Sequence, residues 1–188
     1  MRDALGPDGP SVAQQRNYLS SRADRNVFLR YRDRFRDARA DAHDEIRKAN
    51  LLRETGDQEG WEAASSAAQE KLATLDDLSW MGQVHSVSGF RQTIKTREYW
   101  LDDWGLEHLQ LHFRVKFVIV GAGGGVQMEV APDGLATFRP DYFIVVDLAG
   151  KHYRLRRRGD GKAAFTPAEA EAAGIFSMLP RRGAIFAS

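Results

Sequence analysis

The chain has 188 residues, of which 43% are hydrophobic, and it contains no cysteine. This is a globular composition, long enough for one domain or two small ones. The absence of cysteine excludes disulfides, Cys-ligated zinc, thiol catalysis and the zinc-dependent nucleobase deaminases. The net charge of +1 is unevenly spread, because residues 1–80 hold 13 Lys/Arg against 15 Asp/Glu and residues 81–188 hold 14 against 11. No apolar run reaches the roughly 20 residues of a membrane span.

The first ten residues contain the run Gly6-Pro7-Asp8-Gly9-Pro10 and no apolar signal region. This composition is typical of a linker or a cut end, so residues 1–10 are expected to lie outside the folded domain. The chain is therefore interpreted as a possible excised domain of a larger protein.

A helical hairpin is predicted for residues 11–80. Apolar residues recur at spacings of three and four from Phe28 to Ala49, and again from Trp61 to Leu75. Between the two stripes, Gly56 is a plausible helix stop and Asp57 a plausible N-cap. Because the connection is short, the two helices should be antiparallel. Their apolar stripe is expected to cover the C-terminal sheet, with docking of a protein partner as the alternative.

Residues 81–188 are predicted to form an α+β domain, co-folded with the hairpin. After a connecting zone with a short strand near 83–88 and a helix near 97–110, the hydrophobic period changes to two. The expected strands are 111–120, 126–130, 138–147 and 151–158, and Thr166 begins a short helix with a capping box. The fold class is thus a helical hairpin packed on a four-stranded antiparallel meander, followed by a short C-terminal helix.

One pattern occurs twice in the predicted sheet. The segments 112–116 (HFRVK) and 152–156 (HYRLR) both alternate polar and apolar residues. Side chains alternate between the two faces of a strand, so the histidines and cations should share one face. Phe113, Phe117, Tyr153 and Leu155 should be buried beneath it.

The expected register completes this polar face. A tight turn at Ala149-Gly150 sets Asp147 against His152, where it would orient the imidazole. The glycine turn 121–125 sets Lys116 against Glu129, or Phe117 against Glu129 after a one-residue slip. The alternative is an ordinary exposed face, because Phe143 and Val145 also fall on it.

These residue types are the parts of metal-independent RNA cleavage, in which the ribose supplies the nucleophile. His152 is the predicted general acid and Glu129 the base, with His112 and Asp147 completing the catalytic set. The predicted phosphate-binding residues are Arg114, Lys116, Arg154 and Arg156. The basic stripe 151–162 favours RNA or another polyanion as the partner. No metal and no cofactor is expected.

Helices followed by a four-stranded antiparallel sheet with such a face resemble, in architecture, the ribonuclease toxins of the barnase, EndoU, colicin and RelE types. The resemblance covers about residues 97–160 and matches no sequence motif of those families. It implies a toxin-like domain acting in the cytoplasm, or delivered into a target cell as part of a larger secreted protein. A protein partner, for immunity or assembly, would bind the helical hairpin or the basic face.

Other functions fit the sequence less well. Asp141, Asp147 and Lys151 resemble the metal site of restriction-endonuclease-like nucleases, but the next strand lacks their second carboxylate. Glu107-His108 and His112 lack a third metal ligand, and a strand rather than a helix follows the glycine run, against a dinucleotide site. The main alternative is a non-catalytic protein-interaction module that uses the hairpin, and a nucleic-acid binder without chemistry is a third reading.

Overall fold

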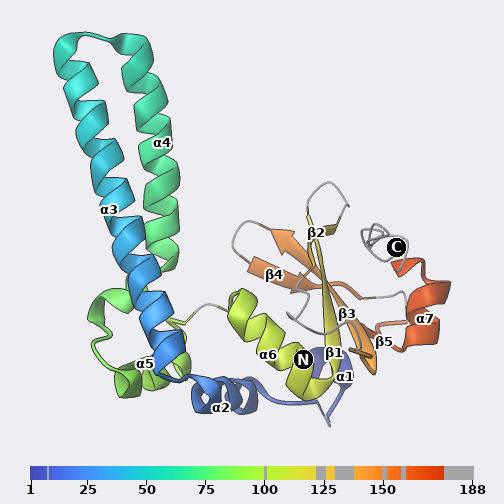
Figure 1. Ribbon diagram of the computed structural model, residues 1–188. Coiled ribbons are helices and arrows are strands. Elements are labelled where there is room, and N and C mark those ends of the chain that lie inside the picture. The colour runs from blue at the N-terminus through green and yellow to red at the C-terminus, as the bar shows by residue number, and fades with distance from the viewer. Residues whose placement is uncertain are drawn as a thin grey trace, which may run out of the picture. The chain divides into compact units, whose positions relative to one another are not determined.

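The computed structural model describes residues 1–7, 9–99, 101–121, 126–129, 138–149, 152–157 and 160–175 (Figure 1). The chain divides into two compact units, one of residues 16–100 and one of residues 1–15 with 101–188. Residues 81–100 therefore belong with the helical hairpin, whereas the sequence pattern placed them with the sheet. The α+β class and the N-terminal hairpin are confirmed.

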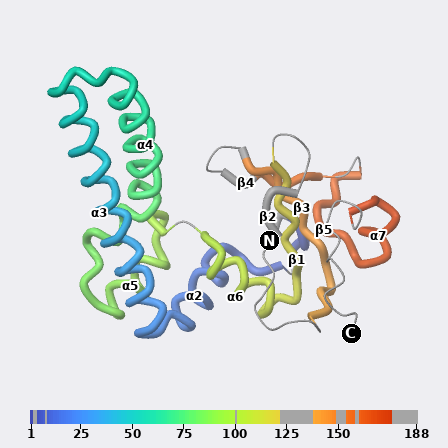
Figure 2. Tube along the Cα trace, turned by 45° about the horizontal axis from the view of Figure 1, so that its top comes forward, coloured from blue at the N-terminus to red at the C-terminus, as the bar shows by residue number. Residues whose placement is uncertain are grey.

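The hairpin consists of α3 (Arg25–Thr55) and α4 (Gln58–Asp77), which lie side by side in Figures 1 and 2. Asp24 caps α3 by accepting from the Val27 amide at 2.9 Å, and Asp57 caps α4 by accepting from the Gly60 amide at 2.9 Å. Gly56 ends α3 with a φ of 76°, a left-handed conformation that glycine adopts without steric cost. The sequence therefore predicted both the break between the helices and its cap.

Small residues form the contact between α3 and α4. Ala42 and Ala49 of α3 and Ala64 and Ala68 of α4 are all buried, which lets the two backbones approach closely. This contact buries little apolar surface per residue, so the distal part of the hairpin has a thin core.

The hairpin base holds the main core of unit 16–100. Besides the start of α3, it is built from residues 16–22 of α2 (Val12–Arg22), the 3-10 helix η1 (Ser79–Gln83) and α5 (Val87–Ile94). The Phe90 ring is fully buried and lies 6.0 Å from the Phe28 ring, 5.2 Å from the Tyr31 ring and 5.9 Å from the Trp80 ring, centroid to centroid. This aromatic cluster anchors α3 to α5.

The strand predicted near residues 83–88 does not form, because the segment leads into α5. Ser86 is the N-cap of that helix and accepts from the Gly89 amide at 3.1 Å. At the other end, the Arg16 guanidinium donates to the Ile94 carbonyl at 2.8 Å and contacts the Thr96 carbonyl. Partial burial lowers the pKa of Arg16. A serine cap and a partly buried arginine thus fix a helix that begins within the segment expected to be a strand.

Unit 1–15 with 101–188 contains a small mixed sheet. Its helices are α1 (Arg2–Leu5), α6 (Asp103–Phe113) and α7 (Pro167–Ala172). Its strands are β1 (Val115–Val120), β2 (Val126–Glu129), β3 (Tyr142–Ala149), β4 (His152–Leu155) and β5 (Ala164–Phe165). The order is β2-β1-β3-β4, and β5 pairs with β3.

The antiparallel meander predicted from the sequence is wrong at its centre. Strands β1 and β3 are parallel, with Val115 opposite Tyr142 and Val120 opposite Asp147, whereas the β1–β2 and β3–β4 pairs are antiparallel. β3 pairs directly with β1, on the side opposite β2, instead of pairing with β2 as the third strand of a meander would. All six residues of β1 are buried, as is typical of a strand in a parallel pair.

Helix α6 extends into the segment that was predicted to begin the first strand. Its N-cap Asp102 accepts from the Gly105 amide at 3.3 Å, and the helix continues through His112 and Phe113. Arg114 ends it with a φ of 52°, and the strand begins only at Val115. His112 is therefore helical, and the two HxRxx segments do not form matching strands.

Both faces of the sheet are covered. One face packs against α7 in a buried cluster made of Val118, Val120, Phe143, Val145, Phe165, Ala170 and Ile175. Ile119 and Ile144, which alternate to the other face, are also buried, and α6 contacts β1. The face that was predicted to be open and polar is therefore largely the hydrophobic core beneath α7.

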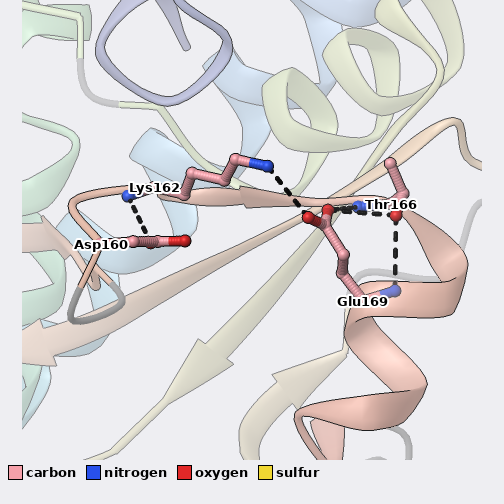
Figure 3. A network of polar contacts seen from close by, with 4 residues as sticks. All are labelled: Asp160, Lys162, Thr166 and Glu169. Carbon is pink, nitrogen blue, oxygen red and sulfur yellow. Dashed lines mark hydrogen bonds and ion pairs between the residues drawn. The ribbon is translucent and has the colours of Figure 1, made fainter.

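The short helix α7 begins as predicted, with a capping box at Thr166 and Glu169 (Figure 3). The Glu169 carboxylate accepts from the Thr166 amide at 2.9 Å, from the Thr166 hydroxyl at 3.0 Å and from Lys162 Nζ at 3.0 Å. These bonds stabilise the charged form, the backbone bond most, and lower the pKa of Glu169 from 4.5 to about 2.

The depressed pKa of Glu169 predicts an acid-labile α7. Its contribution to stability is complete above the pKa of the unfolded chain and is lost as the pH falls from about 4.5 to about 2. We expect the protection of the α7 amides, measured by NMR as the exchange rate relative to the intrinsic rate at each pH, to fall over this interval. Glu169→Gln should remove the pH dependence, whereas Glu171→Gln, at an exposed position of the same helix, should keep it. An unchanged profile in Glu169→Gln would contradict the assignment.

Candidate functional site

The β3–β4 hairpin carries the largest part of the predicted site, but its register differs from the predicted one. Asp147 lies opposite Arg154, and His152 lies opposite Ala149, a shift of two residues from the expected pairing. Asp147 therefore does not face His152. Its carboxylate accepts from Arg156 Nε at 3.2 Å and also contacts Arg156 Nη2.

This arrangement gives Asp147 and Arg156 a different role from the predicted one. The two side chains are about 40% exposed and form a two-point ion pair between β3 and the residue that follows β4. Arg154, which lies opposite Asp147 on β4, is exposed. In the described residues of the β3–β4 hairpin, Asp147 thus orients Arg156. Arg154 is therefore more available to an external anion than Arg156 is.

His152 and Glu129 lie on strands β4 and β2, as the sequence predicted, but their side chains lie outside the described residues. Glu129 pairs with Val118, which excludes both expected registers, since these placed Lys116 or Phe117 opposite it. The roles of His152 as acid and Glu129 as base stay predictions.

Arg114 joins the two parallel strands at their beginning. Its guanidinium donates to both Asp141 carboxylate oxygens, at 2.8 and 3.0 Å, and to the Arg139 carbonyl at 3.3 Å. The Asp141 amide in turn donates to the Arg114 carbonyl at 2.7 Å. The hydrogen bond to Asp141 raises the pKa of Arg114. In this structure Arg114 holds a carboxylate where a phosphate was expected.

Lys116 is 7% exposed within β1, between the buried residues Val115 and Phe117. Its cross-strand neighbour on β3 is Phe143, which belongs to the cluster beneath α7. The side chain therefore does not lie on an open surface, where a phosphate-binding lysine was predicted.

His112 is exposed on α6, and its ring lies edge-to-face against Phe113 at 4.6 Å. His108, one turn earlier, contacts the Trp104 carbonyl through Nδ1 at 2.9 Å. The two histidines do have the helical spacing that the sequence interpretation discounted when it placed His112 in a strand. Even so, no group of three His, Asp or Glu side chains in the described part of the chain could hold a metal ion.

The predicted polar face is therefore not assembled as expected. Arg154 and Asp147 are adjacent, but Lys116 is buried, Arg114 binds Asp141, and His112 belongs to a helix. Because β1 is a central strand covered on both faces, its polar residues cannot form an open site.

A second surface feature lies on the hairpin, where sequence reasoning assigned an apolar stripe to the core. Ile46 is 38% exposed, Leu51 60% and Leu72 44%. A hollow of about 810 Å³ on α3 is lined by His43, Asp44, Glu45, Ile46, Arg47, Lys48, Asn50, Leu51 and Glu54. The exposure of Leu51 could have been predicted from the sequence, because this leucine falls outside the apolar stripe that runs from Phe28 to Ala49.

No helix in the described part of the chain is both long enough and apolar enough to cross a membrane. No protein-family model, curated protein or solved structure matches the chain.

Proposed function

We propose that the chain is a non-catalytic protein-interaction module whose α3–α4 hairpin docks a protein partner. The observation that carries this proposal is the exposure of Ile46, Leu51 and Leu72 along the hairpin. Full burial of a large aliphatic side chain against a partner would stabilise the complex by about 1.5–3 kcal/mol relative to leaving that side chain exposed. Exposed side chains of this size on an otherwise charged helical hairpin favour an interface.

The build of unit 16–100 also supports a docking role. The aromatic cluster around Phe90 fixes the base of α3, while α3 itself, at about 1.5 Å per residue, extends well beyond it. A partner would meet helices that are already formed, so little conformational entropy would be lost on binding.

Metal-independent RNA cleavage is the second candidate. Its support is the basic strand β4, where Arg154 and the nearby Arg157 are exposed. The interaction-module proposal expects purified protein to leave total RNA intact in EDTA. Cleavage that persists in EDTA and is lost in His152→Ala would favour the ribonuclease instead, since a general acid contributes about 10²–10⁴-fold to rate.

The interaction proposal is tested by site-specific photocrosslinking in the cells that naturally produce the chain. A photoreactive residue at position 46, 51 or 72 should give a crosslinked product of defined mass. The same residue at Glu171, which is exposed on α7, is the matched control and should not give that product. Equal products from hairpin and control positions, or none at all, would contradict a docking role for the hairpin.

A further inference from the structure

One side of the hairpin is marked by a contact between its helices. Lys71 Nζ of α4 donates to Asp41 of α3 at 3.0 Å, and this hydrogen bond raises the pKa of Lys71. Around the α3 axis, Asp41 and Ile46 flank the buried line of Ala42 and Ala49 on opposite sides. Ile46 therefore lies on the side of the hairpin that faces away from the Asp41–Lys71 pair.

The same reasoning places Leu72 on that second side. Around the α4 axis, Lys71 and Leu72 flank the buried line of Ala64 and Ala68 on opposite sides. Trp61 is half-buried and lies eleven residues, or about three turns, before Leu72 on the same line. Because Asp41 lies beside Lys71 and the helices are antiparallel, Ile46 is level with the stretch between Trp61 and Leu72.

Ile46, Trp61 and Leu72 thus form an apolar line along the groove between the two helices. We call this surface the second-side groove. The hollow on α3 adjoins it, because Ile46 is part of both and Asn50 lies one turn further along the same helix. Residues at these spacings are those that contact a third helix laid along two others.

The α3 rim of the second-side groove is basic. The rim positions recur at spacings of three and four: Arg32, Arg36, Arg39, His43 and Arg47. Arg32, Arg36 and Arg47 pair with aspartates of α3, at 3.5, 3.1 and 3.0 Å. Arg39 is exposed, has no ion pair with any described residue, and lies seven residues before Ile46 on the same face. The α4 rim carries Gln58, Ser65 and Gln69 level with the apolar line, with Glu62 at its outer edge and Asp76 toward the base of the hairpin.

We propose that the second-side groove binds an amphipathic helix that carries acidic residues beside its apolar stripe. This inference rests on the proposed docking function of the hairpin and names the chemistry of the partner. The apolar stripe of the partner contacts Ile46, Trp61 and Leu72. Its carboxylates lie along the arginine rim, where Arg39 receives one of them.

Charge complementarity selects this partner over a second copy of the chain. In a two-fold dimer formed through the groove, each groove would meet an identical groove with the same excess of arginine. Like charges at close range oppose such pairing, whereas a helix with glutamates beside its apolar stripe meets no repulsion.

Two synthetic helical peptides of about four heptads serve as probes. Both carry Leu at positions a and d, and one carries Glu at positions e and g where the other carries Lys. Like charges at e and g hinder each peptide from pairing with itself. We expect the Glu peptide to bind the full chain at least tenfold more tightly than the Lys peptide, as measured by fluorescence anisotropy.

Charge reversal in the groove tests the assigned rim. Arg39→Glu should weaken binding of the Glu peptide by about threefold to tenfold, because an attractive rim pair becomes a repulsive one. Arg30→Glu, the same change at an exposed position of α3 outside the groove, should have no effect. Ile46→Glu with Leu72→Glu should weaken binding by more than tenfold, whereas Ala73→Glu should not. Circular dichroism checks that each variant remains helical.

Failure of this inference is distinguishable from failure of the proposed function. Equal binding of both peptides, no binding, or equal effects of Arg39→Glu and Arg30→Glu would overturn the acidic-helix partner. If sedimentation shows a dimer that Ile46→Glu with Leu72→Glu dissociates, a second copy occupies the groove. The acidic-helix inference is then overturned, while the docking function of the hairpin stands.

Discussion

Phe90→Ala is expected to lower the stability of unit 16–100 by about 3–5 kcal/mol, the usual cost of removing a large aromatic side chain from a core. Phe90 is fully buried, and its ring contacts Phe28, Tyr31 and Trp80. The cost should lie toward the upper end of the range, because three rigid rings cannot easily collapse into the cavity.

Stability is measured by urea unfolding with hydrogen exchange as the readout, since two compact units need not unfold together. Amides of α3 and α5 should lose protection in Phe90→Ala, and amides of the sheet should not. Leu51→Ala is the matched control on α3, because a side chain that is 60% exposed contributes little. A loss below about 1 kcal/mol in Phe90→Ala would show that the aromatic cluster does not anchor the hairpin.

Gln110→Leu is expected to destabilise the sheet unit by about 1–3 kcal/mol. Gln110 is fully buried on α6, and its side-chain oxygen accepts from the Phe117 amide at 2.8 Å. Leucine has a similar volume but cannot accept a hydrogen bond, so the substitution leaves the β1 amide buried without this partner.

The measurement is hydrogen exchange at Phe117, whose amide should lose protection by more than its neighbours in Gln110→Leu. The neighbouring substitution Leu111→Gln, at a position that is 37% exposed, should change neither exchange nor stability appreciably. If the Phe117 amide keeps full protection in Gln110→Leu, the glutamine does not hold α6 to β1.

Local signals in the sequence predicted local structure well. The caps Asp57 and Thr166 and the stop at Gly56 were all identified, because each depends on backbone groups within a few residues. The boundary at 112–114 was missed because the local pattern there is ambiguous. Five residues that alternate in polarity fit the end of an amphipathic helix as well as the start of a strand.

Strand pairing was predicted less well, because it depends on residues far apart in the sequence. The polarity pattern of residues 126–149 indicates strands, but it does not predict whether β3 pairs with β2 or with β1. Once β3 lies parallel to β1, both sheet faces become core and Lys116 becomes buried. The candidate site failed at this step, since its geometry assumed a sheet with one open face.

The parallel β1–β3 pair also sets an order of folding. Strands β1 and β3 can meet only after the intervening segment has closed into a loop, which carries an entropic cost before any pairing contact forms. The contacts between α3 and α4 start beside the short connection at Gly56 and extend along the helices from there, so no long loop has to close before the first of them forms. Residues 16–100 also leave the ribosome before residues 101–188, which supply the sheet. The hairpin is therefore complete and able to meet other molecules while the sheet is still being synthesised.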